Sequence, residues 1–406
     1  MSNRSAVAKS AIDTQAAIAR LMRLLSVDGV TGREAKIAKE IAAQMREAGV
    51  PGRSIRLDDA NRRIPLATET GNLIVDLPGR GSLNRADRVL FMTHMDTVPL
   101  CAGAAPKRRQ KRIVNEAKTA LGGDNRTGCA VLVALAAELM RQKADHPPLT
   151  LLFTVREESG LWGARHVRPA DLGGAVMGFN YDGRRAADVT IGAVGADRWE
   201  VEIFGRAAHA GVAPDRGISA TMILAEALAA VRAGGWFGKV ARDGRFGTSN
   251  VGPIRGLAGG PAGDATNVVT DYLRVLGESR SHDVGFCKQI TAAYKAAFIG
   301  SAAALTNSEG KAGRVRFTAH TAYRPFRLEE KAPVVRRAVA AVAAEGRNPE
   351  IRIANGGLDA NCMVRHGIPT VTFGAGQNAA HTLDEWIDLT EFTAACRLAF
   401  GLATTA

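Results

Sequence analysis

The sequence has few of the features that mark secreted, membrane-spanning or thiolate-metal proteins. Its 406 residues include five cysteines, and no two of them form a Cys-x-x-Cys pair. Neither a disulfide framework nor a cysteine zinc site is therefore expected. The first fifteen residues lack the apolar core of a signal peptide, and no run of about 18 uncharged apolar residues occurs. We expect a cytoplasmic chain with no membrane partner.

Signatures of nucleic-acid binding are also missing, although the formal net charge of +13 raises that question. The densest basic run, residues 107–112, holds no aromatic side chain that could stack on a base. No zinc-finger, helix-turn-helix or RNA-binding motif accompanies it. We interpret the run as a solvated loop and expect no nucleic acid partner. A steep salt dependence of binding to DNA or RNA would indicate the opposite.

The length and the periodicity of apolar residues predict a larger domain interrupted by a smaller one. A chain of 406 residues exceeds the usual size of one hydrophobic core. Residues 14–27 and 34–50 repeat apolar positions at helical spacing, and 129–142 does so between two apolar strand-like segments, 88–98 and 148–155. Strand, helix and strand in this order predict an α/β fold with a mostly parallel, doubly wound sheet.

The pattern changes near residue 196, where alternating strands and two helices follow one another. The order β-α-β-β-α-β predicts a small ferredoxin-like α+β unit with one open sheet face. We therefore predict an inserted domain at 196–322 within a catalytic domain formed by 1–195 and 323–406.

Two polar residues follow a buried strand in the motif THMDTVP. His94 and Asp96 are alternate residues, so on a strand their side chains point the same way. An imidazole could then bind a metal ion while the carboxylate lies on or behind it. A strand-end histidine and a turn-forming aspartate before Pro99 are the alternative.

Two adjacent glutamates, Glu157 and Glu158, end the next apolar strand in the motif REESG. Neighbouring carboxylates repel each other unless one binds a cation or accepts a proton. In a metallohydrolase one glutamate binds the ion, and the other takes a proton from the attacking water. A solvated surface pair is the alternative.

Three further candidates come from glycine-rich turns and strand ends. Asp124 lies in LGGDNRTG, Asp182 ends FNYDG, and His381 follows the strand at 368–374. Each alone could be a turn or capping residue. Carboxyl ends of strands are nevertheless where open α/β sheets build their sites. Their nitrogen and oxygen ligands favour two divalent ions that share a carboxylate, zinc first, with manganese or cobalt possible.

The motifs THMDTVP, LGGDNRTG, REESG, FNYDG, GRAAHAG, GGLDAN and AAHTLDEW occur in this order along nearly the whole chain. The sequence resembles the peptidase T-like branch of the zinc metallopeptidase and amidohydrolase family. That family also includes acetylornithine deacetylase, succinyl-diaminopimelate desuccinylase and aminoacylases. The resemblance implies a catalytic domain with an inserted lid domain through which two copies dimerise.

The same resemblance implies a site with two metal ions. Asp124 would bridge them, His94 and Asp182 would complete the ligands of one ion, and Glu158 and His381 those of the other.

The resemblance also assigns roles to residues beside these ligands. Glu157 would be the general base and acid, and Asp96 would orient His94. The family often has a second aspartate after the bridging one, in a cis peptide, whereas this chain has Asn125. We expect metal binding to survive that difference.

Four positions are implied in substrate binding. His209 in GRAAHAG would polarise the scissile carbonyl across the dimer, and Asn267 and Arg280 would hold a carbonyl or carboxylate of the substrate. Gly357 lies in GGLDAN, where residues 356–359 could line the substrate end or only form a turn. Tripeptidases tend to have a threonine there, so tripeptide specificity does not follow.

These observations predict metal-dependent hydrolysis of an amide bond in a short peptide. An N-acyl amino acid deacylase of the same family is the alternative, since it needs the same metal chemistry with a different pocket. A non-catalytic binding module would be expected to have lost at least one ligand, and the full set argues against it.

Overall fold

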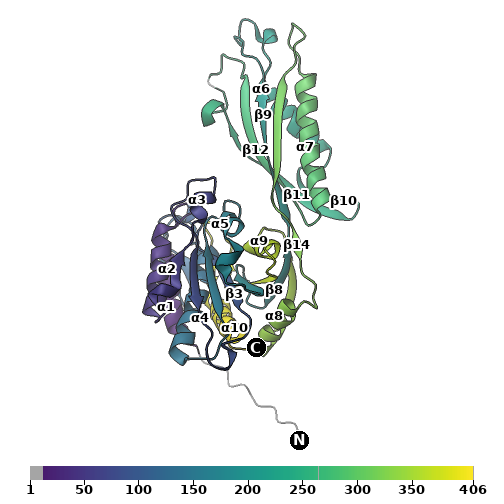
Figure 1. Cartoon of the computed structure of the whole chain (residues 1–406). Helices are drawn as coiled ribbons and strands as arrows, with labels where there is room; N and C mark the ends of the chain where they lie inside the picture. The colour runs from purple at the N-terminus through teal and green to yellow at the C-terminus, as the bar shows by residue number, and fades with distance from the viewer. Residues whose placement is uncertain (1–11, 264, 406) are drawn as a thin grey trace. The chain divides into compact units, whose positions relative to one another are not determined.

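The computed structural model describes residues 12–263 and 265–405 of the chain (Figure 1). The described residues form two compact units. Unit 1 comprises the residues up to Gly192, Arg327–Ala354 and those from Leu358 onward, and unit 2 comprises Ala193–Phe326 with Asn355–Gly357. The roles that the sequence assigns to the two parts, catalytic and lid, stay predictions.

Unit 1 is built on a nine-stranded sheet with the strand order β1-β2-β6-β3-β7-β16-β8-β14, and β15 pairs with β8. The strands are β1 (Ile55–Leu57), β2 (Leu73–Leu77), β3 (Val89–His94), β6 (Leu149–Thr154), β7 (Met177–Tyr181), β8 (Asp188–Ala193), β14 (Phe326–Arg327), β15 (Glu350–Ala354) and β16 (Thr370–Phe373).

Four central strands of this sheet run parallel. β3 pairs in parallel with β6 and β7, and β7 pairs in parallel with β16. On either side, β2 is antiparallel to β6, and β8 is antiparallel to β16. The predicted α/β fold is confirmed, with antiparallel strands flanking its parallel centre. All residues of β3 and β6 are buried, which explains their nearly unbroken apolar sequences.

The parallel registers bring the predicted site residues to one edge of the sheet. His94, the last residue of β3, lies opposite Thr154, the last residue of β6. Tyr181 at the end of β7 lies opposite Phe373 at the end of β16. Polar residues that follow these strands therefore meet at the carboxyl edge, where α/β sheets place their sites.

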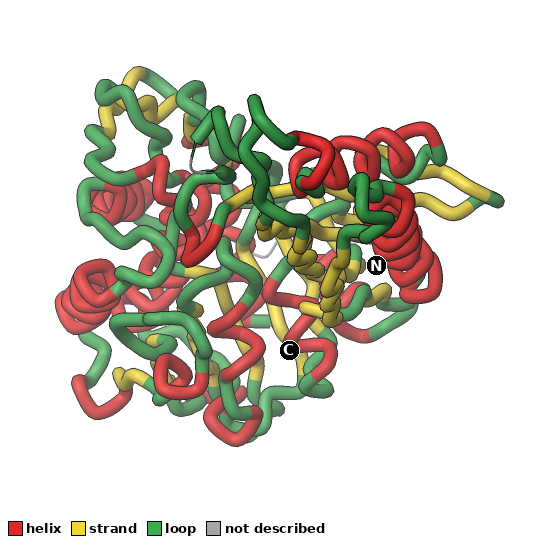
Figure 2. Tube along the Cα trace, turned by 90° about the horizontal axis from the view of Figure 1, so that it is seen from above, coloured by secondary structure: helices red, strands yellow, loops and turns green. Residues whose placement is uncertain are grey.

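Helices flank the sheet of unit 1 (Figures 1 and 2). α4 is buried over most of its length and packs against β3, with α1 and α10 as neighbours, whereas α9 packs against β7 and β16 beside α5. Asp13 and Asp388 cap α1 and α10, because each side chain accepts an N–H of the first turn. The helices are α1 (Thr14–Leu25), α2 (Ala35–Glu47), α3 (Ala60–Arg63), α4 (Gly123–Gln142), α5 (Trp162–His166), α8 (Pro333–Ala344), α9 (Asp359–Arg365) and α10 (Leu389–Thr404).

A small third sheet corrects the interpretation of the basic run as a loop. Its order is β17-β18-β5-β4, and the run forms most of the hairpin of β4 (Pro106–Arg109) and β5 (Arg112–Asn115). β5 pairs with β18 (Trp386–Asp388), which pairs with β17 (Gln377–Asn378). Ile113 is buried and anchors the hairpin, and Arg112 lies 3.9 Å above the Trp386 ring. The sequence did not reveal the two strands of this hairpin, because half of their residues are charged and exposed.

Unit 2 is a five-stranded antiparallel sheet of order β10-β11-β12-β9-β13 that packs against two helices. The ferredoxin-like α+β architecture is confirmed, with β10 as one strand more than predicted. Trp199, Tyr294 and Phe298 form the centre of its core. Its elements are β9 (Gly195–Phe204), α6 (Ala220–Ala233), β10 (Gly238–Arg242), β11 (Arg245–Arg255), β12 (Tyr272–Ser281), α7 (Val284–Ala304) and β13 (Arg314–Tyr323).

Among the described residues, no helix combines the length and the apolar character that a membrane span requires.

Gly128 allows α4 to approach the carboxyl edge of the sheet, and Gly128→Ala tests this contact. An added Cβ would overlap Thr93 Oγ1 and lie 2.5 Å from the Tyr181 carbonyl oxygen. We expect a loss of about 1–3 kcal/mol in the free energy of unfolding, measured by urea denaturation. Gly401→Ala in α10 is the control, because its Cβ meets no atom within 4 Å. It should gain up to about 1 kcal/mol. Equal effects of the two variants would contradict the close approach.

Candidate active site

The five predicted metal ligands gather in unit 1 as two overlapping groups. Each group offers one ligand atom per residue, and these atoms lie within 4.8 Å of one another. Asp124 belongs to both groups. The first group is His94, Asp124 and Asp182, and the second is Asp124, Glu158 and His381.

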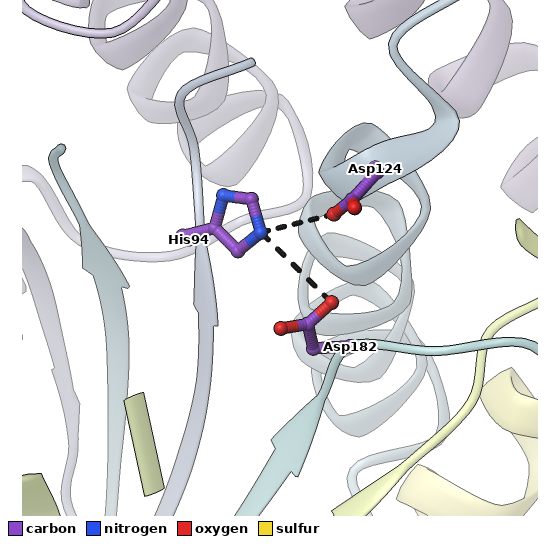
Figure 3. A group of neighbouring side chains, drawn as sticks. All are labelled: His94, Asp124 and Asp182. Atoms are coloured by element: carbon purple, nitrogen blue, oxygen red, sulfur yellow. Dashed lines mark hydrogen bonds and ion pairs between the residues drawn. The ribbon is translucent and has the colours of Figure 1, made fainter. Parts of the chain in front are cut away.

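The first group is shown in Figure 3, where the imidazole of His94 faces both carboxylates. His94 Nε2 lies 3.1 Å from Asp124 Oδ1 and 3.9 Å from Asp182 Oδ1. His94 ends β3, Asp124 lies in the first turn of α4, and Asp182 follows β7. Its N–H donates to the Phe373 carbonyl at 2.8 Å, so β16 fixes the backbone of this ligand.

The second group uses the other oxygen of Asp124. His381 Nε2 lies 3.3 Å from Asp124 Oδ2 and 3.0 Å from Glu158 Oε1. The two carboxylate oxygens of Asp124 therefore face two different imidazoles. This is the arrangement that a carboxylate bridging two cations requires.

Asp96 connects the first group to the glutamate pair. Its side chain is fully buried, and its two oxygens accept the N–H groups of Glu157 at 3.0 Å and Glu158 at 3.2 Å. Asp96 Oδ1 also lies 3.4 Å from His94 Nδ1, which leaves Nε2 facing the carboxylates. This geometry suits the predicted orienting role, which stays a prediction.

Burial and mutual repulsion oppose ionisation of several carboxylates of this site. Burial raises the pKa of Glu157 well above its usual range; the charge of His94 opposes this, and the charges of Asp182, Asp359 and Glu158 add to it. Burial and the charge of Asp124 likewise raise the pKa of Asp182 to about 8. Burial and like charge both disfavour the ionised form.

The carboxylates of the site stabilise positive charge on the imidazoles that face them. Hydrogen bonds to Asp124 and Glu158 raise the pKa of His381 to about 10. Burial opposes ionisation of Asp124, yet its hydrogen bonds with His381 and His94 outweigh burial and lower its pKa. Three carboxylates and two imidazoles form a donor set that suits Zn²⁺, Mn²⁺ or Co²⁺. The residues present therefore fit divalent cations.

Glu385 supports the Asp124 turn and was not recognised in the sequence. It is buried, and its carboxylate accepts the N–H groups of Leu121 at 2.7 Å, Gly122 at 2.7 Å and Asp124 at 3.0 Å. One side chain thus shapes the loop that presents the shared ligand. Its place in the motif AAHTLDEW, four residues after His381, was the available signal.

Glu34 is a second buried carboxylate that sequence reasoning missed. Its Oε1 accepts the N–H groups of Gly32 at 2.6 Å and Arg156 at 3.1 Å, which ties the start of α2 to the segment preceding Glu157. Burial, and next the charge of Asp96, raise the pKa of Glu34 to about 7. Glu34 precedes a helix that contains other glutamates and lysines, so nothing in the sequence distinguished it as a buried carboxylate.

The GGLDAN segment divides between the two units. Asp359 begins α9 in unit 1, is buried, and accepts a hydrogen bond from the Thr154 hydroxyl at the end of β6. Burial raises its pKa to about 6. Gly357 belongs to unit 2, where a Cβ would overlap the Tyr323 hydroxyl. Its predicted substrate contact stays a prediction.

His209, Asn267 and Arg280 all lie in unit 2. His209 and Asn267 are exposed and adjacent, because Ala210 N–H donates to the Asn267 carbonyl at 2.9 Å and His209 pairs with Val268. Arg280 Nε lies 2.8 Å from Glu278 Oε1, so a carboxylate of the chain already contacts its guanidinium. The substrate roles of these residues stay predictions.

Comparison with known proteins assigns the family. Residues 90–405 match the model of peptidase family M20/M25/M40. The chain belongs to this family. It is therefore a peptidase, and the recognition of a peptidase T-like relative in the sequence is confirmed.

Individual relatives resemble this protein over nearly the whole chain. The uncharacterized protein YqjE of Bacillus subtilis is 30% identical over 371 residues, which cover 91% of this chain and 92% of that protein. The structure of aminopeptidase PepT from Bacillus cereus is 29% identical with a TM-score of 0.77, over 97% of this chain and 98% of that one. A tripeptidase from Staphylococcus aureus is 25% identical with a TM-score of 0.82 and the same coverage.

Glu34→Gln tests the buried carboxylate through the pH dependence of stability. Because its pKa rises from 4.5 to about 7, the folded chain holds a proton that the unfolded chain releases. The wild type therefore loses stability as pH rises through this range, and the variant is spared that loss. From about pH 5 to about pH 7.5, the stability of the variant relative to wild type should rise by roughly 2–3 kcal/mol.

Urea denaturation of the metal-free chain measures this difference. Glu330→Gln, at an exposed glutamate of unit 1, corrects for the loss of one negative charge. Parallel pH profiles of Glu34→Gln and wild type would show that Glu34 is ionised throughout.

Proposed function

We propose that this peptidase is a metal-dependent aminopeptidase or tripeptidase that hydrolyses an amide bond in short peptides. Two divalent ions, zinc first, with manganese or cobalt as alternatives, would be held by His94, Asp124 and Asp182 on one side and by Glu158 and His381 on the other. The proposal depends on the orientation of the Asp124 carboxylate, whose Oδ1 faces His94 and whose Oδ2 faces His381.

The substrate class is supported by the solved relatives. The aminopeptidase PepT and the tripeptidase resemble this chain over 97% of its length, in both units rather than in the metal site alone. The name aminopeptidase denotes cleavage at the amino terminus of a peptide, and the name tripeptidase denotes cleavage of tripeptides. We infer the same substrate class for this chain.

Glu157 is the proposed general base and acid. The bound ions would supply Lewis acidity, which lowers the pKa of water and polarises the scissile carbonyl. Glu157 takes a proton from the attacking water and later passes it to the leaving nitrogen, so one proton moves twice and the C–N bond is replaced by C–O. Burial raises the pKa of Glu157 above its usual range, and this direction of shift makes the carboxylate a stronger base toward the attacking water.

Unit 2 would supply the remaining substrate contacts. His209 would stabilise the oxyanion, and the adjacent Asn267 would donate to a carbonyl of the substrate. Arg280 and Gly357 would hold the substrate's carboxylate end. In the homodimer that we propose, His209 would come from the partner copy. The proposed location is the cytoplasm.

An N-acyl amino acid deacylase is the second candidate. The segment GGLDAN contains no threonine, whereas tripeptidases tend to have a threonine-containing version of it. A segment without that hydroxyl would favour an acyl group over a charged peptide amine. The metal chemistry would be the same.

Replacing Glu157 by Gln separates catalysis from metal binding. The amide keeps the shape of the side chain but cannot accept the proton, so kcat should fall roughly 100- to 10,000-fold while bound metal is retained. Metal content by atomic emission and steady-state kinetics measure the two quantities.

Asp182→Asn is the matched comparison, because it makes the same chemical change at a proposed ligand. This variant should lose metal as well as activity. Near-normal turnover of Glu157→Gln would show that another group is the base.

A substrate panel distinguishes the two candidate activities. We expect cleavage of unblocked di- and tripeptides at least tenfold more efficiently than of N-acetyl or N-succinyl amino acids, by kcat/KM. Removal of metal with a chelator should abolish hydrolysis, and Zn²⁺, Mn²⁺ or Co²⁺ should restore it. The reverse preference would establish the deacylase, and activity that survives complete metal removal would contradict both.

A further inference from the structure

Two buried side-chain amides, Asn125 and Gln377, lie beside the shared ligand Asp124. Asn125 is fully buried and Gln377 is only 5% exposed. Gln377 Nε2 lies 2.9 Å from Asn125 Oδ1 and 3.4 Å from Asp124 Oδ1. One amide group therefore donates toward both its amide partner and the proposed bridging carboxylate.

The backbone around Asn125 fixes which way its amide points. Its Oδ1 accepts the N–H of Gly128 at 3.0 Å, and its Nδ2 donates to the carbonyl of Tyr181 at 2.7 Å. An N–H can only donate and a carbonyl can only accept, so the opposite orientation is excluded. Gln377 must then present its NH₂ group to Asn125, because Asn125 Oδ1 is an acceptor.

The same hydrogen-bond network includes one residue next to each ligand of the first group, and these ligands come from three different elements. Asn125 directly follows Asp124 in the first turn of α4. Tyr181 ends β7 immediately before Asp182, and its carbonyl also accepts the hydroxyl of Thr93 at 3.1 Å, one residue before His94. Every ligand of the first group thus has a neighbour in this network.

We propose that Asn125 and Gln377 are positioning residues that hold Asp124 and Asp182 at the separation that the cations require. This inference rests on the proposed metal site. In this chain position 125 lies between the Tyr181 carbonyl and the Gln377 NH₂ group, so the role needs a side chain that donates to the first and accepts from the second. An ionised aspartate at 125 could accept from Gly128 and Gln377 but could not donate to Tyr181, so its oxygen would repel that carbonyl. Gln377 supplies the matching donor.

Asn125→Asp tests the proposal, because the added charge and the lost hydrogen bond to Tyr181 predict opposite changes in cation affinity. An added negative charge beside the site would by itself strengthen cation binding. Loss of the bond to Tyr181 would instead weaken it, by about tenfold as for other groups that orient metal ligands. We expect the weaker binding, measured as the affinity for Zn²⁺ in competition with a chromophoric chelator. Equal or tighter Zn²⁺ binding by Asn125→Asp would overturn the proposal.

Asn307→Asp is the matched control. Asn307 is a buried amide in unit 2 with the same pattern: its Nδ2 donates to the Arg216 carbonyl at 3.0 Å, and its Oδ1 accepts the N–H groups of Glu309 at 3.1 Å and Lys311 at 2.9 Å. Its affinity for Zn²⁺ should stay within twofold of wild type. A loss equal to that of Asn125→Asp would show a general effect of charge burial and would overturn the proposal.

A double-mutant cycle tests whether the two amides act as one unit. Asn125→Leu and Gln377→Leu should each weaken Zn²⁺ binding, and the double variant should lose less than the product of the two single losses. Independent, multiplicative losses would contradict the paired role. Gln377→Leu leaves the bonds of Asn125 to Tyr181 and Gly128 in place, so its own loss of affinity still tests the proposal if Asn125→Leu does not fold.

Both readouts measure Zn²⁺ binding and need no substrate. A chain that cleaves neither peptides nor acylated amino acids, yet loses Zn²⁺ affinity in Asn125→Asp, would refute the proposed function and retain this inference.

Discussion

The structure of unit 1 depends on one electrostatic constraint, the close approach of several carboxylates at the carboxyl edge of a buried parallel sheet. Asp124, Glu157, Glu158 and Asp182 come from three separate segments, and the imidazoles of His94 and His381 lie among them. Burial and mutual repulsion disfavour ionisation of these carboxylates together, and the raised pKa values of Glu157 and Asp182 express that cost. Bound divalent cations would offset this cost, because their positive charge stabilises the ionised carboxylates.

Around this edge, other buried groups hold the backbone rather than the ions. Asp96 accepts the N–H groups of both glutamates, and Glu385 accepts three N–H groups of the Asp124 turn. Glu34 ties the start of α2 to the segment before Glu157. Each of these carboxylates satisfies buried N–H groups that would otherwise be costly to leave without an acceptor. The backbone around the ligands is therefore held by side-chain hydrogen bonds.

The sequence predicts the parts of this structure that have strong local patterns. Apolar runs located the central strands, and polar residues at or after their ends located His94, Asp182, His381 and the glutamate pair, because parallel strands bring their carboxyl ends to one edge. Asp124 came from a glycine-rich turn, and the choice of Glu158 as the ligand came from the family resemblance. The basic hairpin escaped, since its charged exposed side concealed the alternation around Ile113. Glu34, Glu385 and Gln377 escaped for another reason: their importance comes from tertiary hydrogen bonds, which leave no periodic trace. Membership of peptidase family M20/M25/M40 agrees with the family resemblance of the motifs.

Anomalous diffraction from crystals of the full chain grown with Zn²⁺ tests the central claim most directly. The account predicts two peaks on either side of the Asp124 carboxylate, one beside His94 and Asp182 and the other beside Glu158 and His381. A single peak, or peaks that do not share Asp124, would contradict it.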